Sequence, residues 1–291
     1  MLKKIFHWIF DNILFVLTLF LLAFIPLYPK LPLFDIKNTW VYIRAEDFVV
    51  VLALIIWIVS LLRRKISLKT PLTMPILVFW IVGAIATIHG VLLIFPTLSD
   101  VFPNVAFLSM VRRIEYMSLF FIAYMGMKDK RFLSYVAAVL VITLFCVVGY
   151  GLGQKYLGFP AYLTMNEEFA KGIPIQLSFL SRVPSTFAGH YDLAAYLVLI
   201  MPILASLLFG FKNWLVKLTL LGALSSGFVL LFMTVSRVSF FVLLVSLVLV
   251  LFFQKKKFVL LTLPVLALLT LLLVSFTPAL WERFGNTVKE V

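Results

Sequence analysis

Six arginines stand beside the ends of long hydrophobic runs, where a fixed positive charge can hold an anion. They are Arg44, Arg112, Arg113, Arg182, Arg237 and Arg283. The guanidinium fork bonds phosphate oxygens in pairs, keeps its proton at neutral pH and is less strongly hydrated than an ammonium group. Because few lysines share these positions, the set predicts a ligand with phosphates, such as a diphosphate head group at a membrane surface.

Three of the six, Arg182, Arg237 and Arg283, are the candidates for binding that diphosphate. Arg237 interrupts a long apolar stretch where two hydrophobic runs must turn, and an ionisable group in such a place is costly and usually functional. Arg182 lies in SRVPSTFAGHYDLAAYL, whose Pro and Gly residues predict an irregular start to the next helix.

Each of these arginines also has a structural interpretation. Arg237 would cap the last carbonyls of the preceding helix, and Arg283, in WERF, would anchor the chain at the membrane interface. The partners that would hold Arg182 in a salt bridge are Glu167, Glu168 and Asp192.

His190 is the catalytic candidate, because a neutral imidazole can accept the proton of an attacking hydroxyl group. The structural alternative is that His190 caps the helix that it begins or bonds a neighbouring loop. Two further arginines, Arg44 and Arg112, each have a carboxylate three residues on (Asp47 and Glu115). We expect each pair to lie on one helix face and to be mainly structural.

Motifs for other chemistry are missing from the sequence. It has no Walker A, GxGxxG, HExxH, CxxC or DxD pattern, and the three histidines are far apart. We therefore expect no metal and no cofactor. The formal net charge of +13 would suggest nucleic acid in a soluble protein, but here the basic residues separate hydrophobic runs and indicate topology instead.

The elements that must position these residues are hydrophobic segments of membrane-spanning length. The chain is 64% hydrophobic and 13% charged, which predicts an all-α polytopic transmembrane bundle, since helices satisfy their own backbone in hydrocarbon. The expected nine spans are 5–27, 45–62, 74–95, 107–127, 132–152, 192–211, 214–235, 238–253 and 258–277.

The charges of the connecting segments alternate between two sides. The N-terminus and segments 63–70, 128–131, 212–217 and 254–257 carry fourteen of the 25 Lys and Arg residues but only two of the 12 acidic ones. The positive-inside rule places these segments, and the N-terminus with them, in the cytoplasm.

We expect one transmembrane domain over residues 1–291, with a large external loop at 153–191. That loop is too long for a simple connector and too apolar for disorder, so a re-entrant or surface helix is predicted. The last residues turn amphipathic after the final run, which predicts that the chain continues in a longer protein.

Five stretches of the sequence resemble motifs of the O-antigen ligase/polymerase family of bacterial membrane proteins. SRVPSTFAGHYDLAAYLVLIMP is followed by MTVSRVSFFVLL and then WERF, while RAEDFVVVLAL and VRRIEYMSLFF are similar to the family's earlier helix starts. The resemblance implies a protein of the bacterial cytoplasmic (inner) membrane. In that family a later external segment carries a functional histidine, and this sequence ends before that position.

The resemblance implies a glycosyltransferase that moves a glycan from an undecaprenyl-diphosphate donor to an acceptor hydroxyl on the external side. Arg182, Arg237 and Arg283 would hold the diphosphate. The expected partners are the lipid-linked donor, a glycan or lipid acceptor and membrane lipids, with no nucleic acid. Two alternatives stay open: a transporter or flippase of lipid-linked glycans, and a truncated remnant without activity.

The charge pattern predicts which segments an external reagent can reach. In a Cys146→Ser background, Ile66→Cys, Asp129→Cys and Lys256→Cys should resist an impermeant thiol reagent added to intact spheroplasts. Asn166→Cys, in the external loop, should react. Permeabilised cells provide the control, and labelling of the first three cysteines in intact cells would reverse the orientation.

Overall fold

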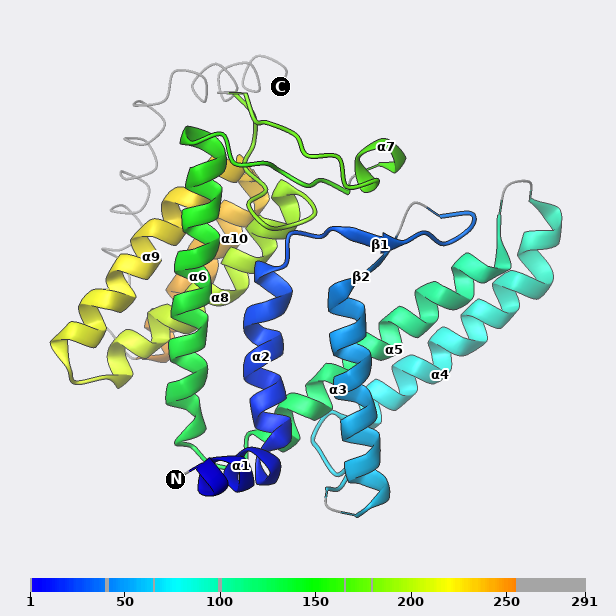
Figure 1. Cartoon of the computed structure of the whole chain (residues 1–291), viewed down its shortest axis with the longest axis horizontal. Coiled ribbons are helices and arrows are strands. Elements are labelled where there is room, and N and C mark those ends of the chain that lie inside the picture. The colour runs from blue at the N-terminus through cyan, green and yellow to red at the C-terminus, as the bar shows by residue number, and fades with distance from the viewer. Residues whose placement is uncertain are drawn as a thin grey trace. The chain divides into compact units, whose positions relative to one another are not determined.

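The computed structural model is predominantly helical and describes residues 2–39, 42–64, 66–98, 101–164, 166–178 and 180–254 (Figure 1). Within these residues, five helical segments are long and apolar enough to cross a membrane, and two shorter apolar helices, α2 and α10, accompany them. The expected ninth span, at 258–277, and Arg283 lie outside the described residues.

The bounds of the elements follow the hydrophobic runs closely. The helices are α1 (Leu2–Asp11), α2 (Ile13–Leu27), α3 (Ala45–Leu62), α4 (Thr73–His89), α5 (Pro103–Gly126), α6 (Phe132–Tyr156), α7 (Glu167–Ala170), α8 (His190–Gly210), α9 (Trp214–Thr234) and α10 (Arg237–Phe253). A π-helical segment (Gly90–Ile94) and a 3₁₀ turn (Phe95–Thr97) extend α4. Two short strands, β1 (Pro32–Phe34) and β2 (Ile43–Arg44), form an antiparallel hairpin.

The contacts divide the chain into two compact units. Unit 1 comprises residues 1–25, 31–139 and 166–171, and unit 2 comprises 26–30, 140–165 and 172–291. The two units are described separately, and the expectation of one transmembrane domain stays a prediction.

The first hydrophobic run of unit 1 is not one continuous helix as expected. It breaks at Asn12 into α1 and α2, and Figure 1 shows α1 lying across the end of α2. The Trp8 ring packs edge-on against Phe15 and Phe132, and Phe15 stacks on Phe132 with ring centroids 3.9 Å apart. The break cannot be seen in the hydropathy of the sequence, which is continuous here. The aromatic ring that packs against both helices, Phe132, belongs to α6 and lies more than a hundred residues later.

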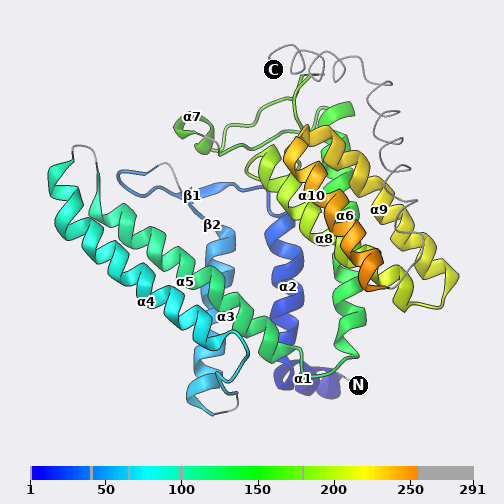
Figure 2. The same ribbon diagram turned by 180° about the vertical axis from the view of Figure 1, so that it is seen from behind.

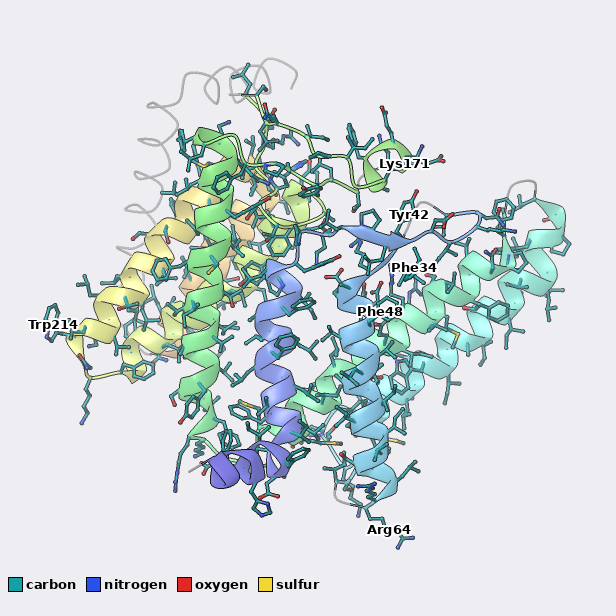
Figure 3. All side chains as sticks on the ribbon, in the orientation of Figure 1. Phe34, Tyr42, Phe48, Arg64, Lys171 and Trp214 are labelled. Atoms are coloured by element: carbon teal, nitrogen blue, oxygen red, sulfur yellow. The ribbon has the colours of Figure 1, made fainter. Side chains whose placement is uncertain are left out.

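The ends of unit 1 sort the connecting segments as the charge pattern predicts. Arg64 lies at the end of α3 opposite Phe34 and Tyr42 (Figure 3), and α1 lies at the same end of the unit as Arg64. At the other end, the Asn104 side-chain amide donates to the backbone oxygen of Lys37 at 3.0 Å. The two segments expected on the external side therefore meet at one end.

Packing of α5 against both α3 and α4 forms the core of unit 1. Trp57 stacks on Phe121 with centroids 5.6 Å apart, and its indole N–H donates to the Met125 sulfur at 3.3 Å. The buried set is almost entirely apolar, as expected where one helix face meets protein and the other meets lipid.

In unit 2, α8 packs against both α9 and α10 (Figure 2). Gly227 on α9 has the Met201 sulfur of α8 and the Leu144 side chain of α6 as its nearest neighbours, so a small residue lets three helices approach closely. Leu197, Leu204 and Leu230 are completely buried among them.

The expected helical character of the 153–191 loop is wrong for the described residues. α6 continues to Tyr156, and the loop then holds only the four-residue α7 and an isolated antiparallel bridge between Ala161 and Ile175. The remaining described segments are irregular, because their backbone bonds to side chains and distant carbonyls instead of to a helix of their own.

Gly126 tests the contact between α5 and α2. A Cβ atom there would lie 2.8 Å from the backbone nitrogen of Phe15 and 2.9 Å from the Leu14 carbonyl carbon. Gly126→Ala should therefore lower the free energy of unfolding by about 1–3 kcal/mol, measured by thermal unfolding in detergent.

Gly83→Ala is the matched control, because nothing lies within 4 Å of its Cβ position in α4. It should leave stability unchanged or raise it by up to about 1 kcal/mol through helix propensity. Equal melting of the two variants would contradict the close approach of α5 to α2.

Candidate functional site

Unit 2 holds the irregular segment 181–189, which carries Arg182 and leads into α8. Ser185 adopts a left-handed backbone conformation (φ 51°) and is buried, with its hydroxyl donating to the Val147 carbonyl at 2.7 Å. The Thr186 hydroxyl donates to the Pro26 carbonyl at 2.5 Å. These bonds hold a segment without regular structure in one position.

Side chains near the end of α6 complete this support. The buried Gln154 amide donates to the carbonyls of Pro160 and Ser185, at 3.0 and 2.9 Å. The Lys155 ammonium donates to the Ser181 carbonyl at 3.0 Å, which brings a second positive charge to the residue next to Arg182. A backbone that lacks helical bonds is thus satisfied from a neighbouring helix.

Arg182 and His190 are in direct contact. One guanidinium nitrogen of Arg182 lies 2.8 Å from His190 Nε2 and 3.4 Å from the Tyr191 hydroxyl. Because arginine only donates hydrogen bonds, His190 Nε2 must be the acceptor, so the imidazole is neutral with its proton on Nδ1. The lone pair that a general base needs is occupied by Arg182 in this arrangement.

A backbone bond joins the Arg182 segment to the turn that carries Arg237. The Val183 amide donates to the Met233 carbonyl at 3.2 Å, near the end of α9. Val235 then adopts a left-handed conformation (φ 55°), which is strained for a β-branched residue, and α10 begins at Arg237. Strained backbone is often found at functional sites.

The α9–α10 turn also borders a hollow of about 220 Å³. Its lining includes Ser236 and the exposed Arg237, together with aromatic side chains of Phe232, Phe240 and Phe241. A charged residue at the mouth of an apolar hollow suits an amphiphile, whose polar end stays at the helix terminus.

The structure brings three of the sequence candidates into unit 2, in two segments that share a hydrogen bond. Arg182 and His190 touch, and Arg237 follows the turn bonded to Val183. Among the described residues of unit 2, no ion pair joins Arg182 to Asp192, so that pairing is wrong, while a pairing with Glu167 or Glu168, which belong to unit 1, stays a prediction. The contact between His190 and the preceding loop agrees with its structural interpretation.

Sequence reasoning missed Lys155 and Tyr191. The position of Tyr191 beside His190 could have indicated that it belongs to the site. Its hydroxyl reaches Arg182, however, only because the chain folds back before α8. Lys155 lies in the last turn of α6, which extends beyond residue 152, where the span was expected to end. No local sequence pattern indicates its hydrogen bond to Ser181.

The two arginines of unit 1 form structural pairs, but with partners other than those expected. Arg44 lies 3.4 Å from Glu46, while its backbone nitrogen donates to the Asp47 carboxylate at 2.9 Å and so caps α3. Arg112 reaches across to Asp47 at 3.5 Å instead of pairing with Glu115 on its own helix. The packing of α3 against α5 therefore determines the partner of Arg112, and the three-residue spacing to Glu115 does not.

Metal ligands are not gathered in the described ranges. There, no group of three or more His, Cys, Asp or Glu side chains lies in a position to hold a metal ion. The expectation that the protein needs neither metal nor cofactor stays a prediction.

Comparison with known proteins gives no identification. No protein-family model matches the chain, and no curated protein or solved structure matches it. The fold and the side chains show a helical chain with several segments of membrane-spanning length, and anything more specific rests on the site itself.

The bond between Arg182 and His190 can be tested through stability. His190→Ala removes the acceptor and should lower the free energy of unfolding by about 1–3 kcal/mol, because a part-buried guanidinium loses its partner. His190→Gln supplies a carbonyl oxygen and should recover part of that loss, as measured by thermal unfolding in detergent.

Tyr191→Phe is the control for this experiment. It removes only a long, exposed contact of 3.4 Å and should change stability little. If His190→Gln proves as damaging as His190→Ala, acceptance by the ring nitrogen is not what stabilises this region.

Proposed function

We propose that the chain is a membrane glycosyltransferase of the O-antigen ligase/polymerase type, acting on an undecaprenyl-diphosphate-linked glycan at the external membrane face. The observation that carries the proposal is the hydrogen-bonded meeting of the Arg182 segment with the α9–α10 turn that bears Arg237. It supports two arginines acting on one diphosphate, a ligand whose oxygens suit guanidinium forks.

The chemistry asked of the site is a displacement at the anomeric carbon. The oxygen of an acceptor hydroxyl forms the new bond to that carbon as the bond to the diphosphate oxygen breaks. The lipid diphosphate leaves with the bonding electron pair, and the hydroxyl proton passes to a base. Arg182 and Arg237 would stabilise the negative charge that grows on the diphosphate.

His190 has a defined part in this proposal. While Arg182 donates to Nε2, that nitrogen cannot take a proton. Binding of the diphosphate would draw the Arg182 fork onto phosphate oxygens and release the Nε2 lone pair. The base would then become available only when the donor is bound, which would limit loss of the activated glycan to water.

The position of the charges supports surface chemistry over transport. Lys155 and Arg182 gather where α6 ends and α8 begins, and Arg237 stands at the first position of α10. Transporters place ionisable groups near the membrane midplane, on discontinuous helices. Charges at helix ends suit a head group that is reached from the aqueous side.

Cells that lack the protein distinguish transfer from flipping. Loss of a transferase should leave the lipid-linked glycan in the outer leaflet, where an added glycosidase or lectin reaches it. Loss of a flippase would leave the glycan in the inner leaflet, protected until the cells are permeabilised. Protection in intact cells would overturn the proposal.

Complementation of the same cells tests the arginines. Arg182→Ala and Arg237→Ala should each slow glycan transfer by about one to two decades, because a charge-assisted bond contributes about 1.5–3 kcal/mol. The lysine variants should recover only part of the rate, since they keep the charge but lose the fork.

Arg131→Ala, an exposed arginine paired with Asp129 on the predicted cytoplasmic side, is the matched control and should transfer normally. Membrane abundance is measured in parallel for every variant. Alanine variants that accumulate normally and transfer at the wild-type rate would refute the diphosphate site. Their disappearance from the membrane would assign both arginines a structural role.

A further inference from the structure

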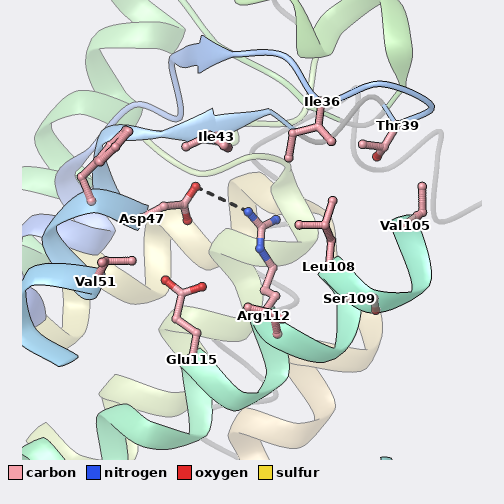
Figure 4. Close-up of a pocket in the computed structure, with 12 residues that line it drawn as sticks. Ile36, Thr39, Ile43, Asp47, Val51, Val105, Leu108, Ser109, Arg112 and Glu115 are labelled. Atoms are coloured by element: carbon pink, nitrogen blue, oxygen red, sulfur yellow. Dashed lines mark hydrogen bonds and ion pairs between the residues drawn. The ribbon is translucent and has the colours of Figure 1, made fainter. Parts of the chain in front are cut away.

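A second hollow, of about 490 Å³, lies in unit 1 between α3 and α5 and is bordered by the segment that leads into β2 (Figure 4). This volume falls within the range of about 300–1,000 Å³ that is typical of small-molecule pockets. The site proposed for the diphosphate uses none of its residues.

The walls of this hollow are largely apolar. Phe48 and Val51 on α3 face it, as do Leu108 and Val111 on α5, and all four side chains are also exposed at the surface of the unit. α3 is long and apolar enough to cross a membrane, so the wall that it contributes is suited to contact with hydrocarbon. A ligand with a hydrocarbon chain matches them.

One side of the hollow is polar, and not all of its polar atoms have hydrogen-bond partners among the described residues. Figure 4 shows the Arg112 guanidinium directed at Asp47, with the Glu115 carboxylate beside it. Glu115 Oε1 is buried and has no hydrogen-bond partner among the described residues. A buried acceptor without a donor is costly, so this oxygen points to a ligand that supplies an N–H or O–H group.

The charges of the lining narrow the class of ligand further. Arg112 pairs with Asp47, so Glu115 is the lining carboxyl that has no ion-pair partner among the described residues. A head group with a net negative charge, such as a diphosphate, would not balance this carboxyl group. An ammonium group balances the charge and donates the missing hydrogen bond.

We propose that this hollow binds a membrane lipid whose head group carries a primary ammonium, with an N–H donating to Glu115 and the hydrocarbon chain lying along Phe48, Val51 and Val111. A quaternary ammonium keeps the charge but has no N–H to donate. A hydroxyl group donates but does not balance the charge. This binding does not depend on glycosyl transfer.

The test compares three lipids with the same acyl chains, added to the purified chain in detergent. Phosphatidylethanolamine has a primary ammonium, phosphatidylcholine a quaternary one, and phosphatidylglycerol is anionic. Native mass spectrometry gives the apparent affinity of each. Phosphatidylethanolamine should bind about tenfold or more tightly than the other two, as expected for one charge-assisted hydrogen bond.

Glu115→Gln should remove the preference for phosphatidylethanolamine over phosphatidylcholine. Glu167→Gln, an exposed glutamate on α7, is the matched control and should keep the preference. Equal binding of all three lipids by the wild type would mean that bulk lipid simply fills the groove, and it would overturn the proposal. A preference that survives Glu115→Gln would do so too.

Val51→Trp tests the same site without changing its charge. The larger side chain fills the apolar part of the hollow, so phosphatidylethanolamine affinity should fall about tenfold while the protein stays in the membrane. This variant decides the matter if Glu115→Gln does not accumulate. Unchanged affinity in Val51→Trp would show that the lipid binds elsewhere.

Discussion

The hydrogen bonds from α6 to the segment before α8 are the interactions on which the candidate site depends. Backbone groups near hydrocarbon must be paired, and this segment has no helix or sheet that would pair them. Gln154 and Ser185 bond to backbone carbonyls, and the Val183 amide uses a carbonyl of α9. The backbone on both sides of Arg182 is therefore held by hydrogen bonds from α6 and α9.

In both units, an arginine is held by a side chain of the same unit. In unit 1, Asp47 accepts from the backbone amide of Arg44, the residue before α3, and also holds Arg112 across the helix contact. In unit 2, a neutral imidazole accepts from Arg182, so a cation is held without a carboxylate to compete for its ligand. The first arrangement pairs an arginine with a carboxylate, whereas the second pairs one with a neutral acceptor.

The sequence alone predicted the helices whose ends are marked by charged residues. It did not predict features that depend on contacts between residues far apart in the chain. α3 begins and ends as expected because charges at Arg44 and Arg63 bound its apolar run. The break at Asn12 was not predicted, because the hydropathy is continuous there and the ring that packs against Trp8 is the distant Phe132. Arg182 and His190 were both selected by type, but their contact depends on the path of a loop that local patterns do not encode.

The break at Asn12 has a consequence for the surrounding lipid. It leaves α2 with 15 residues, or about 22 Å of helix, while the hydrocarbon core of a bilayer is about 30 Å thick. For α2 to cross, acyl chains beside it must compress, at a cost of fractions of a kcal/mol per Å of mismatch. The bilayer would then be locally thinner beside α2 than beside longer helices such as α6.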